Sequence, residues 1–183
     1  MKKTAVLLYP QFSEYELTTA LSLLMQGGKP ISVISLDRNP IIGEAGLSVI
    51  ADQTIDEIHV EDFDSLLLTG CMDIFKVLEN HTYIDFIKNI ANQEHFIIAS
   101  ISSSPALLAK AGLLTNKNYT VGLFEEARVN SRLFDEANYV NELVVQDGNL
   151  ITALGVSFIT WGVMFAKALQ LEFDEGWYRE GIR

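Results

Sequence analysis

The sequence predicts an α/β protein with a flavodoxin-like three-layer sandwich, in which a mostly parallel sheet lies between helices and carries a small antiparallel hairpin. Short apolar runs without turn residues alternate along the chain with amphipathic segments of helical period, as in repeated strand and helix units. The chain has 183 residues, 49% of them hydrophobic, which is enough to form one hydrophobic core but too few to form two domains of ordinary size. No internal repeat or low-complexity linker divides the chain, so we expect one domain over residues 1–183.

The first strand and the first helix are predicted at the N-terminus. Residues 4–9 form a short apolar run typical of a parallel strand that is buried on both faces, and Pro10 ends it. Ser13 followed by Glu16 has the spacing of a helix capping box. The amphipathic segment that follows ends at Gly27-Gly28, which predicts a helix between these points.

The middle of the chain continues the alternation. Three more apolar runs predict strands, at residues 31–36, 65–69 and 95–101. Residues 41–50, interrupted by two glycines, predict a hairpin or a short irregular excursion, and residues 82–92 predict a helix.

The last third of the chain contains two helices and a hairpin. Ser104 as N-cap and Pro105 at the first helical position predict a helix that stops at Gly112. Residues 119–124 read as another strand, and the Asp147-Gly148 pair predicts a tight turn between two short strands. A final helix is expected over residues 157–171.

Composition excludes several classes of protein. A formal net charge of −11 disfavours nucleic-acid binding, which needs clustered Lys and Arg. A single cysteine, Cys71, excludes an intrachain disulfide, and no Cys/His cluster has zinc-ligand spacing, so we expect neither metal nor cofactor. The apolar run before Pro10 is too short for a secretory signal, and no stretch of 18 apolar residues predicts a membrane span. We therefore expect a cytoplasmic protein.

A serine-rich turn is the strongest candidate for chemistry. In parallel α/β sheets, ligands bind outside the carboxyl ends of the strands, which points to residues 10–16, 70–73 and 102–105. Ser102 lies between a buried strand and a helix N-terminus, the geometry of a nucleophile elbow. A serine-rich loop that merely caps a helix has the same pattern, so both readings remain open.

Three segments together resemble the ThiJ/PfpI family of DJ-one-like proteins. Residues 96–114, FIIASISSSPALLAKAGLL, resemble that family's strand, elbow and helix, in which the elbow reads roughly Ala-Ile-Cys-x-Gly-Pro. Residues 12–16, FSEYE, resemble its first loop, and residues 144–153, VVQDGNLITA, resemble its late hairpin. The resemblance implies one ThiJ/PfpI-like domain over residues 1–183.

The resemblance also implies the site residues. Ser102 takes the position of the family's nucleophilic cysteine, and Glu16 takes that of the carboxylic acid that hydrogen-bonds it. Gly70 and Cys71 match the Gly-Gly pair whose backbone N–H groups help to form an anion pocket, and Ser103 supplies a further backbone donor. Alternatively, Glu16 is only a helix cap. The Cys71 thiol is either only packed in the core or lies beside the same pocket and has taken over redox or nucleophilic work.

The departures from the family pattern concern the chemistry. A thiol becomes a thiolate at a helix N-terminus, whereas a serine hydroxyl needs an adjacent base. The histidine that many relatives place beside the nucleophile is replaced by Ser103 or by a residue near Val121. His95 is expected at the far end of its strand, and His81 is the histidine that could lie nearer to the elbow.

Two functions follow from this pattern. One is a regulatory, non-catalytic member that binds a small carbonyl- or carboxylate-bearing ligand or a protein partner. The other is a hydrolase-like or glyoxalase/deglycase-like enzyme that uses Ser102 with Glu16 and backbone donors near Cys71 and Ser103. Because relatives commonly self-associate and include stress-response factors, the resemblance also implies a homodimer and a stress-related role.

Overall fold

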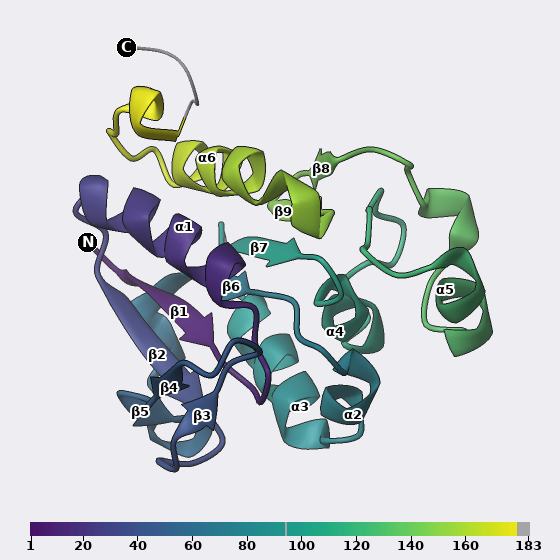
Figure 1. The fold of residues 1–183 in the computed structure, drawn as a ribbon, viewed down its shortest axis with the longest axis horizontal. Coiled ribbons are helices and arrows are strands. Elements are labelled where there is room, and N and C mark those ends of the chain that lie inside the picture. The colour runs from purple at the N-terminus through teal and green to yellow at the C-terminus, as the bar shows by residue number, and fades with distance from the viewer. Residues whose placement is uncertain (94, 179–183) are drawn as a thin grey trace.

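Seven strands form one sheet in the computed structural model, in the order β5-β2-β1-β6-β7-β9-β8 (Figure 1). The structure describes residues 1–93 and 95–178, so the last five residues of the expected domain lie outside the described part. All neighbouring strands are parallel except β8 and β9. The strands are β1 (Lys3–Leu7), β2 (Ile31–Ser35), β5 (Gln53–Thr54), β6 (Phe63–Leu68), β7 (Ile97–Ile101), β8 (Val144–Asp147) and β9 (Leu150–Ala153).

Helices cover both faces of the sheet. Alternate side chains of β1 enter two separate hydrophobic clusters, Ala5 and Leu7 one of them and Val6 the other. One face is covered by α1 (Glu14–Gln26) and α6 (Phe158–Ala168), and the other by α2 (Ile74–Leu78), α3 (His81–Ala91) and α4 (Pro105–Lys110) (Figure 1). The predicted flavodoxin-like sandwich with a mostly parallel sheet is confirmed.

Two antiparallel additions accompany the main sheet. β3 (Ile41–Ile42) and β4 (Ser48–Val49) form a small separate hairpin, as the sequence predicted. The Asp147-Gly148 turn joins β8 to β9, and Gly148 has the positive φ of 61° that this turn requires.

The predicted strand at 119–124 is wrong. Only Tyr119 makes a bridge, to Tyr139, because the backbone then turns and Gly122 N–H donates to Ser102 O at 2.6 Å. The helix α5 (Glu125–Ser131), which the sequence analysis did not predict, follows.

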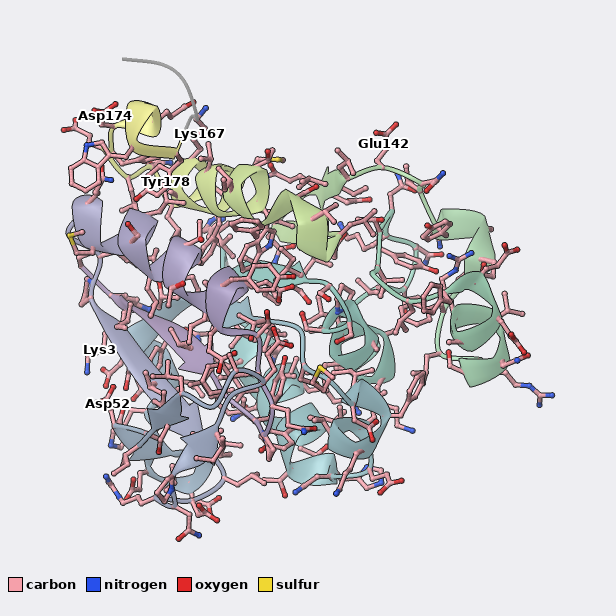
Figure 2. The ribbon with its side chains drawn as sticks, in the orientation of Figure 1. Lys3, Asp52, Glu142, Lys167, Asp174 and Tyr178 are labelled. Atoms are coloured by element: carbon pink, nitrogen blue, oxygen red, sulfur yellow. The ribbon has the colours of Figure 1, made fainter. Side chains whose placement is uncertain are left out.

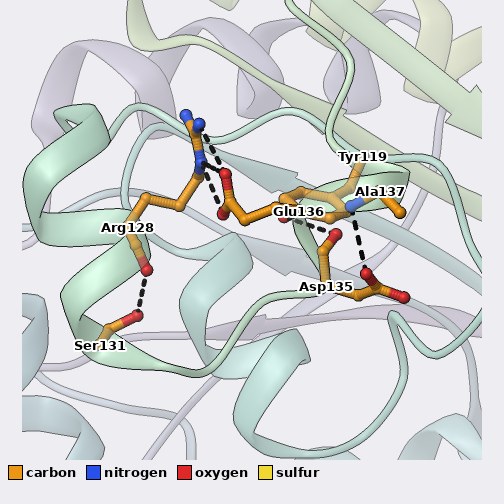
Figure 3. Close-up of polar contacts among 6 residues, drawn as sticks. All are labelled: Tyr119, Arg128, Ser131, Asp135, Glu136 and Ala137. Atoms are coloured by element: carbon orange, nitrogen blue, oxygen red, sulfur yellow. Dashed lines mark hydrogen bonds and ion pairs between the residues drawn. The ribbon is translucent and has the colours of Figure 1, made fainter.

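A buried arginine stabilises the segment of residues 119–139, which we call the excursion. Arg128 Nε lies 3.0 Å from both carboxylate oxygens of Glu136, and Arg128 Nη2 donates to Oε2 at 2.9 Å (Figure 3). The guanidinium carbon lies 3.5 Å from the centroid of the Tyr139 ring. Tyr119 stacks on Phe134 and donates its hydroxyl to Asp135 O at 3.3 Å. These contacts hold the two ends of the excursion together.

Several element ends differ from the prediction. Ser13 is the N-cap of α1, but the predicted capping box is wrong, since Ser13 Oγ donates to Glu44 Oε1 and makes no capping bond. β7 begins at Ile97 rather than at His95, whose φ of 59° is left-handed. The last helix ends at Ala168, three residues earlier than expected.

The segment after α6 returns along α1. Tyr178, which Figure 2 labels beside α1, has its Oη 2.7 Å from Ser22 Oγ and accepts from Gln26 Nε2 at 2.9 Å. Asp174 N–H donates to Gln26 Oε1 at 3.0 Å. No helix within the described residues is long and apolar enough to cross a membrane.

Candidate functional site

The carboxyl ends of three central strands bring the predicted site residues together. The strand order reverses between β1 and β6, because the chain passes from β1 outward to β2 and then returns to the other side of β1. Glu16 lies in the first turn of the helix after β1, Gly70 follows β6, and Ser102 follows β7. A reversal of this kind opens the crevice in which ligands of such sheets bind.

Ser102 occupies a strained turn between β7 and α4. Its φ is 61°, a left-handed value that is uncommon for a residue with a side chain. Both its backbone groups are bound, the N–H to Ala153 O at 2.8 Å and the carbonyl to Gly122 N–H at 2.6 Å. The residue is partly exposed.

Ser104 ties this turn to the sheet. Its Oγ lies 3.0 Å from Leu68 O and 2.7 Å from Ile101 O, and it makes no side-chain capping bond to α4. Ser104 is therefore the N-cap by position, as predicted, while its hydroxyl connects the end of β7 to the end of β6.

Glu16 is the buried acid of the site, with 1% of its surface exposed. Its Oε2 accepts the Gly70 N–H at 2.7 Å, and its Oε1 accepts the Tyr15 hydroxyl at 3.2 Å. The Ser102 hydroxyl lies beside this carboxyl group. Burial raises the pKa of Glu16 to about 7, even though the hydrogen bonds from Gly70 and Tyr15 and the nearby Ser102 hydroxyl act in the opposite direction.

Gly70 permits the close approach of Ser102 and Glu16. A β-carbon on Gly70 would lie 2.7 Å from Ser102 Oγ and 3.2 Å from Glu16 Oε2. One on Gly155 would lie 3.0 Å from Glu16 Oε1 and 3.4 Å from Ser102 Oγ. Two glycines from separate loops therefore form the walls of the site where a side chain would displace the reactive groups.

Cys71 and Ser103 bind each other beside the site. Cys71 N–H donates to Ser103 Oγ at 3.3 Å. Burial raises the pKa of the Cys71 thiol to about 12, so the thiol stays protonated at neutral pH and is a poor nucleophile. The N–H groups of Gly70 and Cys71 are thus engaged within the chain, whereas Ser103 N–H has no hydrogen-bond partner among the described residues.

The histidines do not complete the site. His59 and His95 precede β6 and β7, which puts them at the opposite edge of the sheet from Ser102. His81 begins α3 and lines a separate hollow with Phe75 and Lys110. No group of three His, Cys, Asp or Glu side chains in the described part of the chain could hold a metal ion.

Sequence reasoning missed three contributors to the site. These are the Tyr15 hydroxyl on Glu16, the Gly122 amide on Ser102, and the wall formed by Gly155. Tyr15 could have been suspected because it adjoins Glu16, and its ring is held edge-on against Phe158 at 5.1 Å. Gly122 and Gly155 give no signal in the sequence, since their roles depend on where the chain returns.

Comparisons of the sequence and of the structure with known proteins agree with one another. The sequence model of the DJ-1/PfpI family matches residues 2–168. An uncharacterized protein of Methanocaldococcus jannaschii is 27% identical over 175 residues, which are 93% of this chain and 84% of that protein. A deglycase of Pyrococcus horikoshii is 28% identical over 163 residues, covering 87% and 95%. A DJ-1 superfamily protein of Agrobacterium tumefaciens has a TM-score of 0.84 at 22% identity, over 97% of this chain and 95% of that one, and so shares the fold.

Proposed function

The chain belongs to the DJ-1/PfpI family, and from that premise we propose that it binds a small carbonyl- or carboxylate-bearing ligand at Ser102 in a regulatory, non-catalytic role. The resemblance inferred from the sequence is confirmed at the level of the family. In the proposal, Ser102 stands where the family has its cysteine nucleophile, at a nucleophile elbow, and Glu16 is the acid beside it.

The proposal depends on which backbone N–H groups of the site are already hydrogen-bonded within the chain. Catalysis at a carbonyl needs preorganised donors that face the developing oxyanion. Here the Gly70 amide is bound to Glu16 and the Cys71 amide to Ser103 Oγ. Ser103 N–H and the Ser102 hydroxyl are left to hold a ligand oxygen, which supports binding more than it supports transition-state stabilisation.

A deglycase-like or hydrolase-like enzyme is the second candidate, and a specific observation favours it. The carboxyl of Glu16 has a pKa of about 7 and lies beside the Ser102 hydroxyl. At neutral pH it could therefore take the Ser102 proton while Oγ adds to an ester carbonyl carbon and the π electrons move to the carbonyl oxygen. The proton then goes to the alcohol as its bond to that carbon breaks, and a water that loses its proton to Glu16 releases the acyl group from Oγ. The relative from Pyrococcus horikoshii is named a deglycase, which supports the same reading.

One set of variants separates the two functions. Wild type, Ser102→Ala, Ser102→Cys and Glu16→Gln are compared for saturable binding and for turnover of methylglyoxal and a panel of activated esters. Ser48→Ala, an exposed serine in β4, serves as the matched control.

We expect the wild type to bind methylglyoxal without turnover, and Ser102→Ala and Glu16→Gln to bind it more weakly. Activity that appears only in Ser102→Cys would fit a scaffold that remains competent but has given up the family reaction. Turnover by the wild type that disappears in Ser102→Ala would overturn the binding proposal in favour of the enzyme. The absence of both binding and turnover would refute both.

A homodimer is part of the proposal, as are a cytoplasmic location and a stress-related role. Exposed apolar side chains adjoin residues of the site, Tyr15 next to Glu16, Val156 next to Gly155 and Ile159 next to Phe158, whose ring meets that of Tyr15. A second copy could cover them. Sedimentation of the wild type and of Val156→Asp tests this point. A wild-type monomer at all concentrations would refute it.

A further inference from the structure

A groove lies beside the carboxyl ends of β1 and β2, separate from the Ser102 site. Two adjoining hollows of about 360 and 440 Å³ share Pro10, Gln11, Leu36 and Tyr83 in their walls, and we call them together the Tyr83 groove. The volume of each hollow is in the range of sites for small ligands, which such sheets bind at this edge.

The hydroxyl of Tyr83 is the first sign of a ligand. The residue is 4% exposed, and its ring meets the Tyr9 ring edge-on at 5.8 Å. Tyr9 donates its own hydroxyl to Thr69 O. The Tyr83 hydroxyl has no hydrogen-bond partner in the part of the chain that the structure describes and is accessible from the groove, so it is free to bind a ligand.

The surroundings of Tyr83 define what could pair with it. Asp37 and Tyr83 line the same hollow. Burial, and next the negative charge of Asp37, raise the pKa of Tyr83 to about 12, so its hydroxyl stays protonated. Asp37 uses Oδ1 to accept the Asn39 N–H at 2.8 Å. A ligand ammonium group could donate both to the Asp37 carboxylate and to the Tyr83 oxygen.

The other end of the groove contains a cation. Lys76 lines the hollow next to α2 and forms no ion pair with the other described residues. Asp73 lines the same hollow and its negative charge offsets part of that of Lys76, while its Oδ1 accepts the Lys76 N–H as the N-cap of α2. Asn80 accepts the Thr82 N–H with Oδ1, which leaves its amide nitrogen as a donor. Both remaining donors suit a carboxylate.

The wall between these ends is apolar and fixed. Leu36 lines both hollows, Val77 one and Ile42 the other. Gln11 has a left-handed φ of 60°, and its backbone is held by Ile42 O at 2.7 Å and by Met72 N–H at 3.2 Å. A strained but doubly anchored wall is preorganised, so a ligand need not order it.

We propose that the Tyr83 groove binds an elongated zwitterion with an apolar side chain, of amino-acid to dipeptide size. Its ammonium group lies on Asp37 and Tyr83, its carboxylate faces Lys76 and Asn80, and its side chain packs against Leu36. This site is independent of any chemistry at Ser102.

Calorimetric titration with the dipeptide alanyl-leucine tests the proposal, alongside its N-acetyl and C-terminal amide derivatives. We expect saturable binding of the free dipeptide and at least tenfold weaker binding of each blocked form. Tyr83→Phe removes one hydroxyl and keeps the ring, so the affinity should fall by about 3- to 10-fold. Lys76→Gln should weaken the binding of the free dipeptide but not that of its amide. Lys88 is an exposed lysine of α3, and Lys88→Gln should change neither affinity.

Any one of three results would refute the proposal that the Tyr83 groove binds the dipeptide. They are the absence of binding at millimolar dipeptide, equal affinities for the free and blocked forms, and an unchanged affinity in a Tyr83→Phe protein that melts at the wild-type temperature. Ser102→Ala is expected to bind the dipeptide as the wild type does. Loss of binding in that variant would move the ligand to the Ser102 site and refute the groove, whatever the outcome of the methylglyoxal experiments.

Discussion

Replacement of Glu16 by Gln is expected to remove a large part of the pH dependence of stability. The wild-type carboxyl has a pKa of about 7 in the folded chain against an ordinary value of 4.5. Folding therefore takes up a proton at this residue between these two pH values. The stability that this group contributes is fully present below pH 4.5 and is lost as the pH rises through 7.

The size of the effect follows from the same two pKa values. One pH unit corresponds to about 1.36 kcal/mol, so the interval between them is worth roughly 3 kcal/mol. Glutamine has nearly the same shape, can still accept the Gly70 N–H, and does not ionise. The free energy of unfolding of the wild type relative to Glu16→Gln should accordingly fall by roughly 2 to 3 kcal/mol from pH 5 to pH 8.

Urea denaturation at half-unit pH intervals measures this difference. Glu126→Gln, an exposed glutamate in the first turn of α5, is the matched control and should follow the wild type at every pH. If the difference between the wild type and Glu16→Gln stayed constant from pH 5 to pH 8, Glu16 would not be a buried carboxyl of raised pKa, and the argument for it as a base would fail.

Three further substitutions test the site and the segment beside it. Tyr15→Phe deletes a hydrogen bond that lowers the pKa of Glu16, so the midpoint of the same stability titration should move to higher pH; an unmoved midpoint would contradict that contact. Gly70→Ala puts a β-carbon 2.7 Å from Ser102 Oγ, and urea denaturation should show a loss of about 1–3 kcal/mol, whereas wild-type stability would exclude so close an approach. Arg128→Lys replaces the bidentate contact with Glu136 by a point charge. We expect the free energy of unfolding to fall by about 1–2 kcal/mol and the amides of residues 119–139 to exchange faster. Protection like that of the wild type would argue against a stabilising role for this contact.

The order of strands and helices could be read from the sequence because it depends on local periodicity. The apolar runs at β1, β2, β6 and β7 and the Asp147-Gly148 turn each carry their signal within a few residues. Residues 119–124 have the same apolar character, but they do not form a strand. The competing contact, from Gly122 to Ser102, joins positions that are far apart along the chain.

The site was predictable only in part. Ser102 was found because a sharp turn between a buried strand and a helix is a local pattern, and Glu16 because its loop resembles that of a known family. Local spacing assigned Glu16 to a capping box with Ser13. In the folded chain the carboxylate instead accepts the Gly70 N–H.

The sequence by itself determined the fold class, the elements that carry it and the identity of the residue at the turn. The tertiary structure decided what surrounds that residue. It buries Glu16, binds the Gly70 N–H to Glu16 and the Cys71 N–H to Ser103 Oγ, and brings the Tyr15 hydroxyl to the Glu16 carboxyl group. The physical reason is that burial and hydrogen bonding depend on the order of strands in the sheet. The adjacent parallel strands β1, β6 and β7 bring residues 16, 70 and 102 to one edge, and the reversal of strand order between β1 and β6 opens the crevice there.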